Sequence, residues 1–183
     1  MNDIERLLHG VASVAPTTLA GRLTSLPAPA SAEDVARAEA ALGFALPPLL
    51  AGLYTRIADG GYGPEYGLFP LVDGKNRGPS AVARYLALRA QGEGDPDWGW
   101  PEGVLPISDW GCAMLACVDC RSENATVLLF EPNPGIADLA WYIDSPGLAE
   151  WLRGWLDGTA WFCEEDGETD LDMAPWPEFR ARI

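Results

Sequence analysis

The sequence feature that most constrains the fold is the stretch from residue 28 to 71, which predicts two helices joined by a tight bend. Ser31, followed three residues later by Asp34, matches the helix-start pattern in which a hydroxyl caps a free backbone N–H. Gly43 suits the left-handed conformation that commonly ends a helix. Pro48 suits a first helical turn, because the N–H groups there have no helical partner. The stretch therefore predicts a helix, a bend and a second helix.

The second predicted helix carries an apolar stripe and ends at a glycine turn. Leu49, Leu53 and Ile57 recur at helical spacing and predict a buried face. The Asp-Gly-Gly sequence at 59–61 ends the helix, and the short apolar run at 67–71 is typical of a strand. We expect this helix pair to form the core together with strands later in the chain.

The motifs of this stretch resemble the signature of the SUKH superfamily, Smi/Knr type. That signature consists of Leu-Gly, two further residues and Leu-Pro, followed by an apolar helix and a glycine turn that is often Asn-Gly-Gly. In this chain Asp59 stands at the Asn position. The similarity extends to about residue 130 through the sequence LPISDWG and the apolar runs after it. The residues that carry the motifs are Leu42, Gly43, Leu46, Pro47, Asp59, Gly60, Gly61, Trp110 and Gly111.

Further helices and strands are predicted outside this stretch. Ser80 begins a third helix, and Ser145-Pro146 begins a last helix with a wide apolar face. Residues 4–8 predict a short helix at the start. Three apolar runs predict strands, at residues 104–108, 113–119 and 125–130. The consecutive apolar residues indicate that both faces of these strands are buried.

Together these elements predict a single α/β (α+β) domain over residues 1–183. We expect a mixed, mainly antiparallel sheet with helices packed mostly on one side. A length of 183 residues fits one domain, and 48% hydrophobic with 21% charged residues is typical of a globular chain. Residues 157–183 lie outside the resemblance and hold an acidic run, so we expect an acidic C-terminal extension.

The net charge is the most unusual property of the composition. Asp and Glu number 27 and Lys and Arg 12, which gives −15. Such a surface repels nucleic acid and anionic lipid and favours a basic protein partner, although solubility alone is an alternative explanation. The first residues lack the apolar core of a signal peptide, and no run is long enough to span a bilayer. We expect a cytoplasmic protein with reduced cysteines.

The cysteines do not predict a metal site. Cys117 and Cys120 form one CxxC pair, and Cys112 and Cys163 supply no second pair of the kind that tetrahedral zinc needs. An odd separation within one strand would also point the two side chains to opposite faces. We expect no metal and no cofactor.

Catalytic patterns are weak as well. His9 is the single histidine, so it is the one residue that could serve as the base of a Cys–His or Ser–His pair. Paired carboxylates such as Asp95 with Asp97 could serve a hydrolase, but they are common by chance in an acidic chain. We therefore expect no enzyme, and a carboxylate-based hydrolase stays the less favoured alternative.

Two acidic and aromatic surfaces are the candidate partner-binding sites. Tryptophan is enriched at binding hot spots, and clustered carboxylates steer basic partners. The alternative is that each tryptophan covers the core and each acidic run is a solvated face. The first surface consists of Asp95, Asp97, Trp98, Trp100 and Glu102, and the second of Glu164, Glu165, Asp166 and Glu168.

The resemblance and the charge together favour a binding function. For bacterial members, the SUKH resemblance implies immunity proteins that bind and neutralise toxins, often nucleases. The acidity independently suits a basic nuclease-type toxin as partner. A regulatory scaffold, as in the fungal members of the family, is the alternative.

Overall fold

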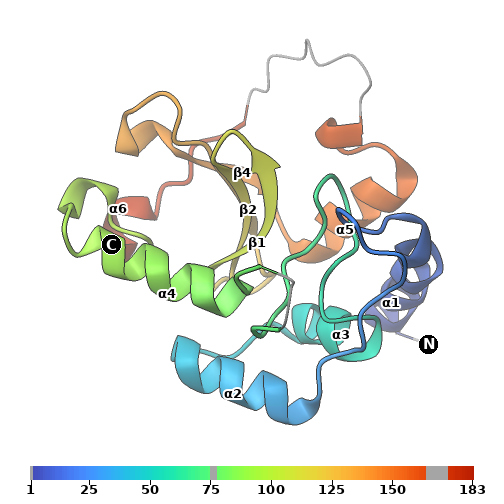
Figure 1. Cartoon of the computed structure of the whole chain (residues 1–183). Helices are drawn as coiled ribbons and strands as arrows, with labels where there is room; N and C mark the ends of the chain where they lie inside the picture. Colours follow the sequence, from blue (N-terminus) through green and yellow to red (C-terminus); the bar gives the residue numbers. More distant parts are fainter. Residues whose placement is uncertain (1, 75–77, 164–172) are drawn as a thin grey trace.

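A four-stranded antiparallel sheet lies at the centre of the structure (Figure 1). The computed structural model describes residues 2–74, 78–163 and 173–183. The strands follow one another in chain order: β1 (Val104–Gly111), β2 (Met114–Asp119), β3 (Val127–Phe130) and β4 (Trp141–Ser145). Their consecutive apolar residues are buried along most of β1, β2 and β3, as predicted. The mixed α/β fold class is confirmed.

Helices surround the sheet and contact one another. They are α1 (Asp3–Val14), α2 (Ala32–Leu42), α3 (Pro48–Arg56), α4 (Ala81–Gly92), α5 (Leu148–Asp157) and α6 (Phe179–Arg182). Helices α1, α3 and α5 pack against one another, and α5 also contacts β4. Helix α4 packs along β1, while the short α6 lies on the side of the sheet opposite α5 (Figure 1).

The predicted helix pair is confirmed as α2 and α3. Ser31 and Asp34 form a reciprocal capping box at the start of α2, and Gly43 ends the helix with a left-handed φ of 79°. Leu50, Leu53 and Tyr54 of α3 are fully buried. Of the predicted stripe, Leu49 and Leu53 are buried, whereas Ile57 is half-buried and is the C-cap residue just after α3.

Several predicted boundaries were wrong. The run at 67–71 forms no strand and pairs with β1 only through a single bridge between Leu68 and Ser108. Ser145 ends β4, a strand the sequence reading missed, and Gly147 is the N-cap of α5. The first helix extends to Val14, well past the predicted end.

Both edges of the sheet are covered by irregular chain segments. The N–H of Phe69 donates to the carbonyl of Ile107 in β1 at 2.8 Å. On the far edge, Ile143 in β4 donates to Ala174 at 2.9 Å, and Trp176 donates to Trp141 at 3.0 Å. Covered edges protect a sheet from pairing with another chain. Residues 173–183 are thus packed against the sheet.

Candidate partner-binding surface

The first predicted surface lies on the tryptophan loop, residues 93–102, which joins α4 to β1. Within it, Pro96–Trp98 form a short 3₁₀ turn, and the Asp95 carboxylate accepts from the N–H of Asp97 at 3.3 Å. Asp95 and Asp97 are exposed, and Trp98 is half-buried against the core. The loop therefore presents two carboxylates beside one partly accessible indole.

Trp100 does not belong to this surface, which corrects the prediction. It is 3% exposed, and its indole N–H donates to the carbonyl of Val104 at 2.7 Å. Its ring packs edge-on against Phe130 and Trp141 at centroid distances of 5.2 and 4.9 Å. Trp100 is a core residue and offers a partner no contact area.

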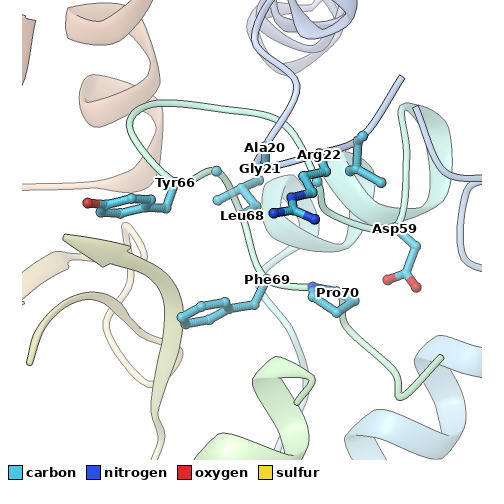
Figure 2. Close-up of a pocket in the computed structure, with 11 residues that line it drawn as sticks. Ala20, Gly21, Arg22, Asp59, Tyr66, Leu68, Phe69 and Pro70 are labelled. Carbon is cyan, nitrogen blue, oxygen red and sulfur yellow. The ribbon is translucent and has the colours of Figure 1, made fainter. Parts of the chain in front are cut away.

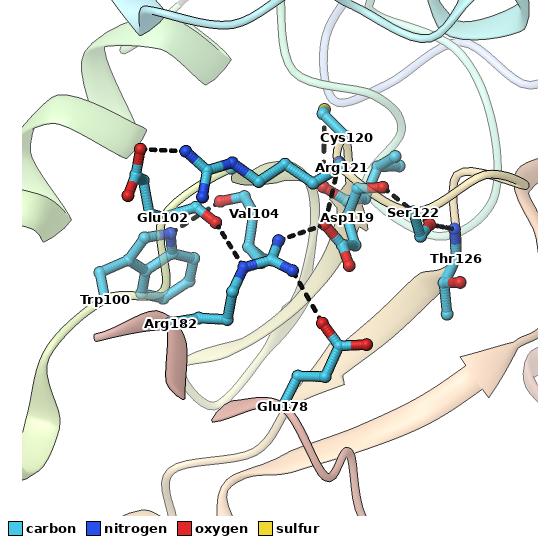
Figure 3. Close-up of polar contacts among 12 residues, drawn as sticks. Trp100, Glu102, Val104, Asp119, Cys120, Arg121, Ser122, Thr126, Glu178 and Arg182 are labelled. Carbon is cyan, nitrogen blue, oxygen red and sulfur yellow. Dashed lines mark hydrogen bonds and ion pairs between the residues drawn. The ribbon is translucent and has the colours of Figure 1, made fainter. Parts of the chain in front are cut away.

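The carboxylates of the loop are partly neutralised by arginines. The guanidinium of Arg180 in α6 lies 3.5 Å from the Asp97 carboxylate. Arg180 also donates a hydrogen bond to Asp138, which holds the pKa of the Asp138 carboxyl below its usual range. Glu102 pairs with Arg121 across the start of β1 (Figure 3). The loop is consequently less negative than its sequence suggests.

Arg182 ties the C-terminal helix to the same region (Figure 3). Its guanidinium lies 2.6 Å from the buried Asp119 carboxylate and 2.8 Å from Glu178. The backbone of Glu102 donates to the carbonyl of Arg182 at 2.8 Å. These contacts fix the base of the tryptophan loop, and the spacing of charges in the sequence gave no sign of them.

The second predicted surface, Glu164, Glu165, Asp166 and Glu168, lies outside the residues that the structure describes. Its neighbours on either side are placed. Trp161–Cys163 form a 3₁₀ turn after α5, in which Phe162 packs on Trp110 at a centroid distance of 4.9 Å. Trp176 and Phe179 are buried against Trp141.

The residues of the family motif hold the fold together through burial, hydrogen bonding and close backbone packing. Leu42 and Leu46 are buried, and the Asp59 carboxylate accepts from the N–H of Leu71 at 2.7 Å. A side chain at Gly60 would meet the backbone of residues 68 and 69, because its Cβ would lie 2.4 Å from a carbonyl oxygen. Trp110 packs against Trp151 of α5. The motif thus builds the turn that carries the chain from α3 towards β1.

One acidic and aromatic surface was missed by the sequence reading. Tyr66 is 61% exposed and lies against Gly111 at the tip of the β1–β2 hairpin. Glu65 is its neighbour in the chain, and Asp109 lies in the same hairpin, where it accepts from the N–H of Gly111. Neither carboxylate has a cationic partner among the described residues. In the sequence, the one sign of this surface was the position of Tyr66 among residues that favour turns.

The titratable groups give little support for nucleophilic or metal chemistry. Burial raises the pKa of the Cys117 and Cys120 thiols, which keeps them protonated and poorly nucleophilic. His9 is exposed on α1. Across residues 2–74, 78–163 and 173–183, the His, Cys, Asp and Glu side chains form no group of three or more suited to a metal ion.

Asp144 of β4 is half-buried, and one of its carboxylate oxygens is out of contact with solvent. Its pKa is raised because burial outweighs the nearby indole N–H groups of Trp161 and Trp151 and the hydroxyl of Ser145, which donates to it at 3.2 Å. Neither indole N–H completes a hydrogen bond of good geometry with the described atoms. The carboxyl faces α5 and the turn after it, so we assign it a structural role beside the core.

Comparison with known proteins places the chain in a family. The model of the SMI1 / KNR4 family (SUKH-1) matches residues 29–154, well over half of the chain. The comparison with curated proteins finds no match. None of the helices in the described part of the chain combines the length and the apolar character that crossing a membrane would require. On the extent of the family match, the chain belongs to the SMI1 / KNR4 family (SUKH-1).

Proposed function

We propose that this protein is a non-enzymatic binding domain that acts as an immunity protein against a basic, nuclease-type toxin. The observation that carries the proposal is the family match over residues 29–154. For bacterial members, this family resemblance implies binding of toxins rather than catalysis. The net charge of −15 supports a basic partner independently, because opposite charge accelerates encounter.

The tryptophan loop is the proposed contact surface. Asp95 and Asp97 are exposed beside the half-buried Trp98, and Arg180 neutralises only part of their charge. Carboxylates act mainly on the association rate, whereas a partly buried indole acts mainly on dissociation. Glu164, Glu165, Asp166 and Glu168 are proposed as a second contact region on charge alone.

Co-expression with the product of a neighbouring toxin gene tests the function. We expect rescue of growth and co-purification of the two proteins. If no neighbouring gene is toxic, or if the toxin kills despite a folded protein, the immunity assignment fails.

Charge reversal tests the surface. The double change Asp95→Lys and Asp97→Lys should lower the association rate and reduce its salt dependence, because both effects arise from long-range charge. The matched control is Glu33→Lys with Glu123→Lys, since both residues are exposed, lie on other elements and give the same change in net charge. Equal effects of the two pairs would mean that only the overall charge matters and would reject the loop as the contact surface.

A further inference from the structure

A cavity of about 410 Å³ opens between the N-terminal segment and the turn after α3 (Figure 2). Its walls come from three parts of the chain, which are residues 20–23, Asp59 with Gly61, and residues 66–70. The first stretch precedes the family match, which begins at residue 29. The cavity is therefore formed jointly by the part of the chain that matches the family and by the segment before it. Its volume lies in the range of small-molecule sites, about 300–1,000 Å³.

The segment before the family match is held firmly against the core. The N–H of Ala20 donates to the carbonyl of Gly61 at 2.9 Å, and Leu19 forms a β-bridge with Tyr62. Two glycines allow this close approach. A Cβ at Gly61 would lie 2.5 Å from the Leu23 side chain, and one at Gly67 would lie 2.8 Å from Ala20. The cavity is thus a built feature and not a gap beside a loose loop.

Arg22 is the one cationic side chain among the described residues that line the cavity, and its guanidinium lies between Leu68 and Asp59 in the view of Figure 2. It makes no hydrogen bond or ion pair with any residue of the described ranges. Most other described arginines have a carboxylate partner, as Arg37, Arg56 and Arg153 show. In a chain of net charge −15, an arginine that has no acidic partner among the described residues and lies at a cavity is available for an anionic ligand.

The remaining walls favour one negative charge on an apolar body. Leu68, Phe69 and Pro70 supply apolar surface, and Tyr66 stands exposed at one end (Figure 2). Asp59 is 3% exposed and already accepts from the N–H of Leu71, so it offers the ligand no open carboxylate. One guanidinium matches one carboxylate through two parallel hydrogen bonds. A phosphate dianion would need more positive charge than the described lining residues supply.

A second arginine, Arg84, stacks on Phe69 but is not among the residues that line the cavity. The guanidinium carbon of Arg84 is 4.0 Å from the centroid of the Phe69 ring, and its Nε has no hydrogen-bond partner among the described atoms. This cation adds to the positive potential near Phe69. We infer that the cavity binds a small monocarboxylic acid with a flat or branched apolar body, and that Arg22 pairs with its carboxylate. This binding goes beyond the proposed toxin-binding function and does not depend on it.

Phenylacetate is the probe, and its uncharged match is phenylacetamide. In titrations of ¹⁵N-labelled protein followed by NMR, phenylacetate should shift the amide signals of Gly21, Gly61 and Gly67. Phenylacetamide should bind about tenfold more weakly, as expected for loss of a charged hydrogen bond. Arg22→Gln should bring phenylacetate to the same weak level, and Arg22→Lys should retain part of the affinity. Arg37→Gln, a change at an exposed arginine of α2, should have no effect.

Three outcomes would overturn the inference. The first is equal binding of the acid and the amide, and the second is unchanged binding in Arg22→Gln. The third is a peptide with a free C-terminal phenylalanine shifting these amides while phenylacetate does not, which would assign the cavity to a partner protein's chain end. Thermal unfolding of each variant shows whether a loss of binding reflects a loss of folding.

Discussion

The helix pair α2–α3 and the C-terminal segment 173–183 are both packed into the fold, but they are held by different forces. The helix pair buries an uninterrupted apolar face that includes Leu50 and Leu53. The C-terminal segment buries Trp176 and Phe179 and adds a buried ion pair between Arg182 and Asp119. The comparison teaches that local apolar periodicity fixes the first region, whereas side chains distant in sequence fix the second.

The largest expected effect is on the helix pair. Leu53 is fully buried in α3, so Leu53→Ala removes apolar contacts and leaves a cavity. We expect a loss of about 2–5 kcal/mol in the free energy of unfolding, measured by denaturant titration. A loss below about 1 kcal/mol would contradict the assigned packing.

The next effect tests the buried ion pair of the C-terminal segment. Arg182→Ala leaves the Asp119 carboxylate, whose side chain is 2% exposed, without its guanidinium partner. We expect a loss of about 1–3 kcal/mol in the free energy of unfolding, because a buried charge loses its hydrogen bond.

Arg180→Ala is the matched control for that change, since both arginines lie in α6. The Arg180 side chain is 45% exposed, and the side chains of its two acidic partners are more exposed still. Its removal should cost no more than about 1 kcal/mol, as exposed ion pairs do. Equal losses for Arg180→Ala and Arg182→Ala would show that burial does not distinguish the two pairs.

The same contrast explains what the sequence could predict. The capping box of Ser31, the stop at Gly43 and the buried face of α3 follow from rules that act within a few residues. Strand β4 was missed because its sequence, WYIDS, is short and mixes polar with apolar residues. The covering of its edge by Ala174 and Trp176 joins residues about 30 positions apart, which no local pattern reports.

The candidate surface shows a similar limit. The acids of the tryptophan loop were identified by composition, but their pairing with Arg180 and Arg121 depends on where α6 and the β2–β3 loop lie. Trp98 and Trp100 are two residues apart, yet one is half-buried and the other is in the core. From the sequence alone the two tryptophans are equally good candidates for a binding surface, and only the fold shows which one is buried.

A smaller effect is expected at Asp144, in the strand that the C-terminal segment covers. Burial raises the pKa of Asp144 in the folded state above 3.8. As the pH rises, Asp144 therefore ionises in the unfolded chain before it ionises in the folded protein. Asp144 therefore lowers the free energy of unfolding progressively from that pH up to its folded-state pKa. The stability of Asp144→Asn relative to the parent protein should therefore increase as the pH rises above about 4. A stability difference that does not change with pH would show that the carboxyl is not perturbed by burial.

The smallest expected effect on stability comes from comparing two carboxylates that each pair with an arginine of α6. Asp97 and Asp119 each pair with an arginine of α6, but the Asp97 side chain is 84% exposed and that of Asp119 is 2% exposed. Asp97→Asn should change the free energy of unfolding by less than about 1 kcal/mol, because water already solvates both partners. Asp119→Asn should cost about 1–3 kcal/mol, since the buried guanidinium of Arg182 then loses its buried counter-charge and keeps only the exposed Glu178. Denaturant titration of both variants measures the difference directly. If Asp97→Asn proves as costly as Asp119→Asn, the ion pair of the tryptophan loop is a structural contact, and charge reversal at Asp97 can no longer serve as a probe of partner binding.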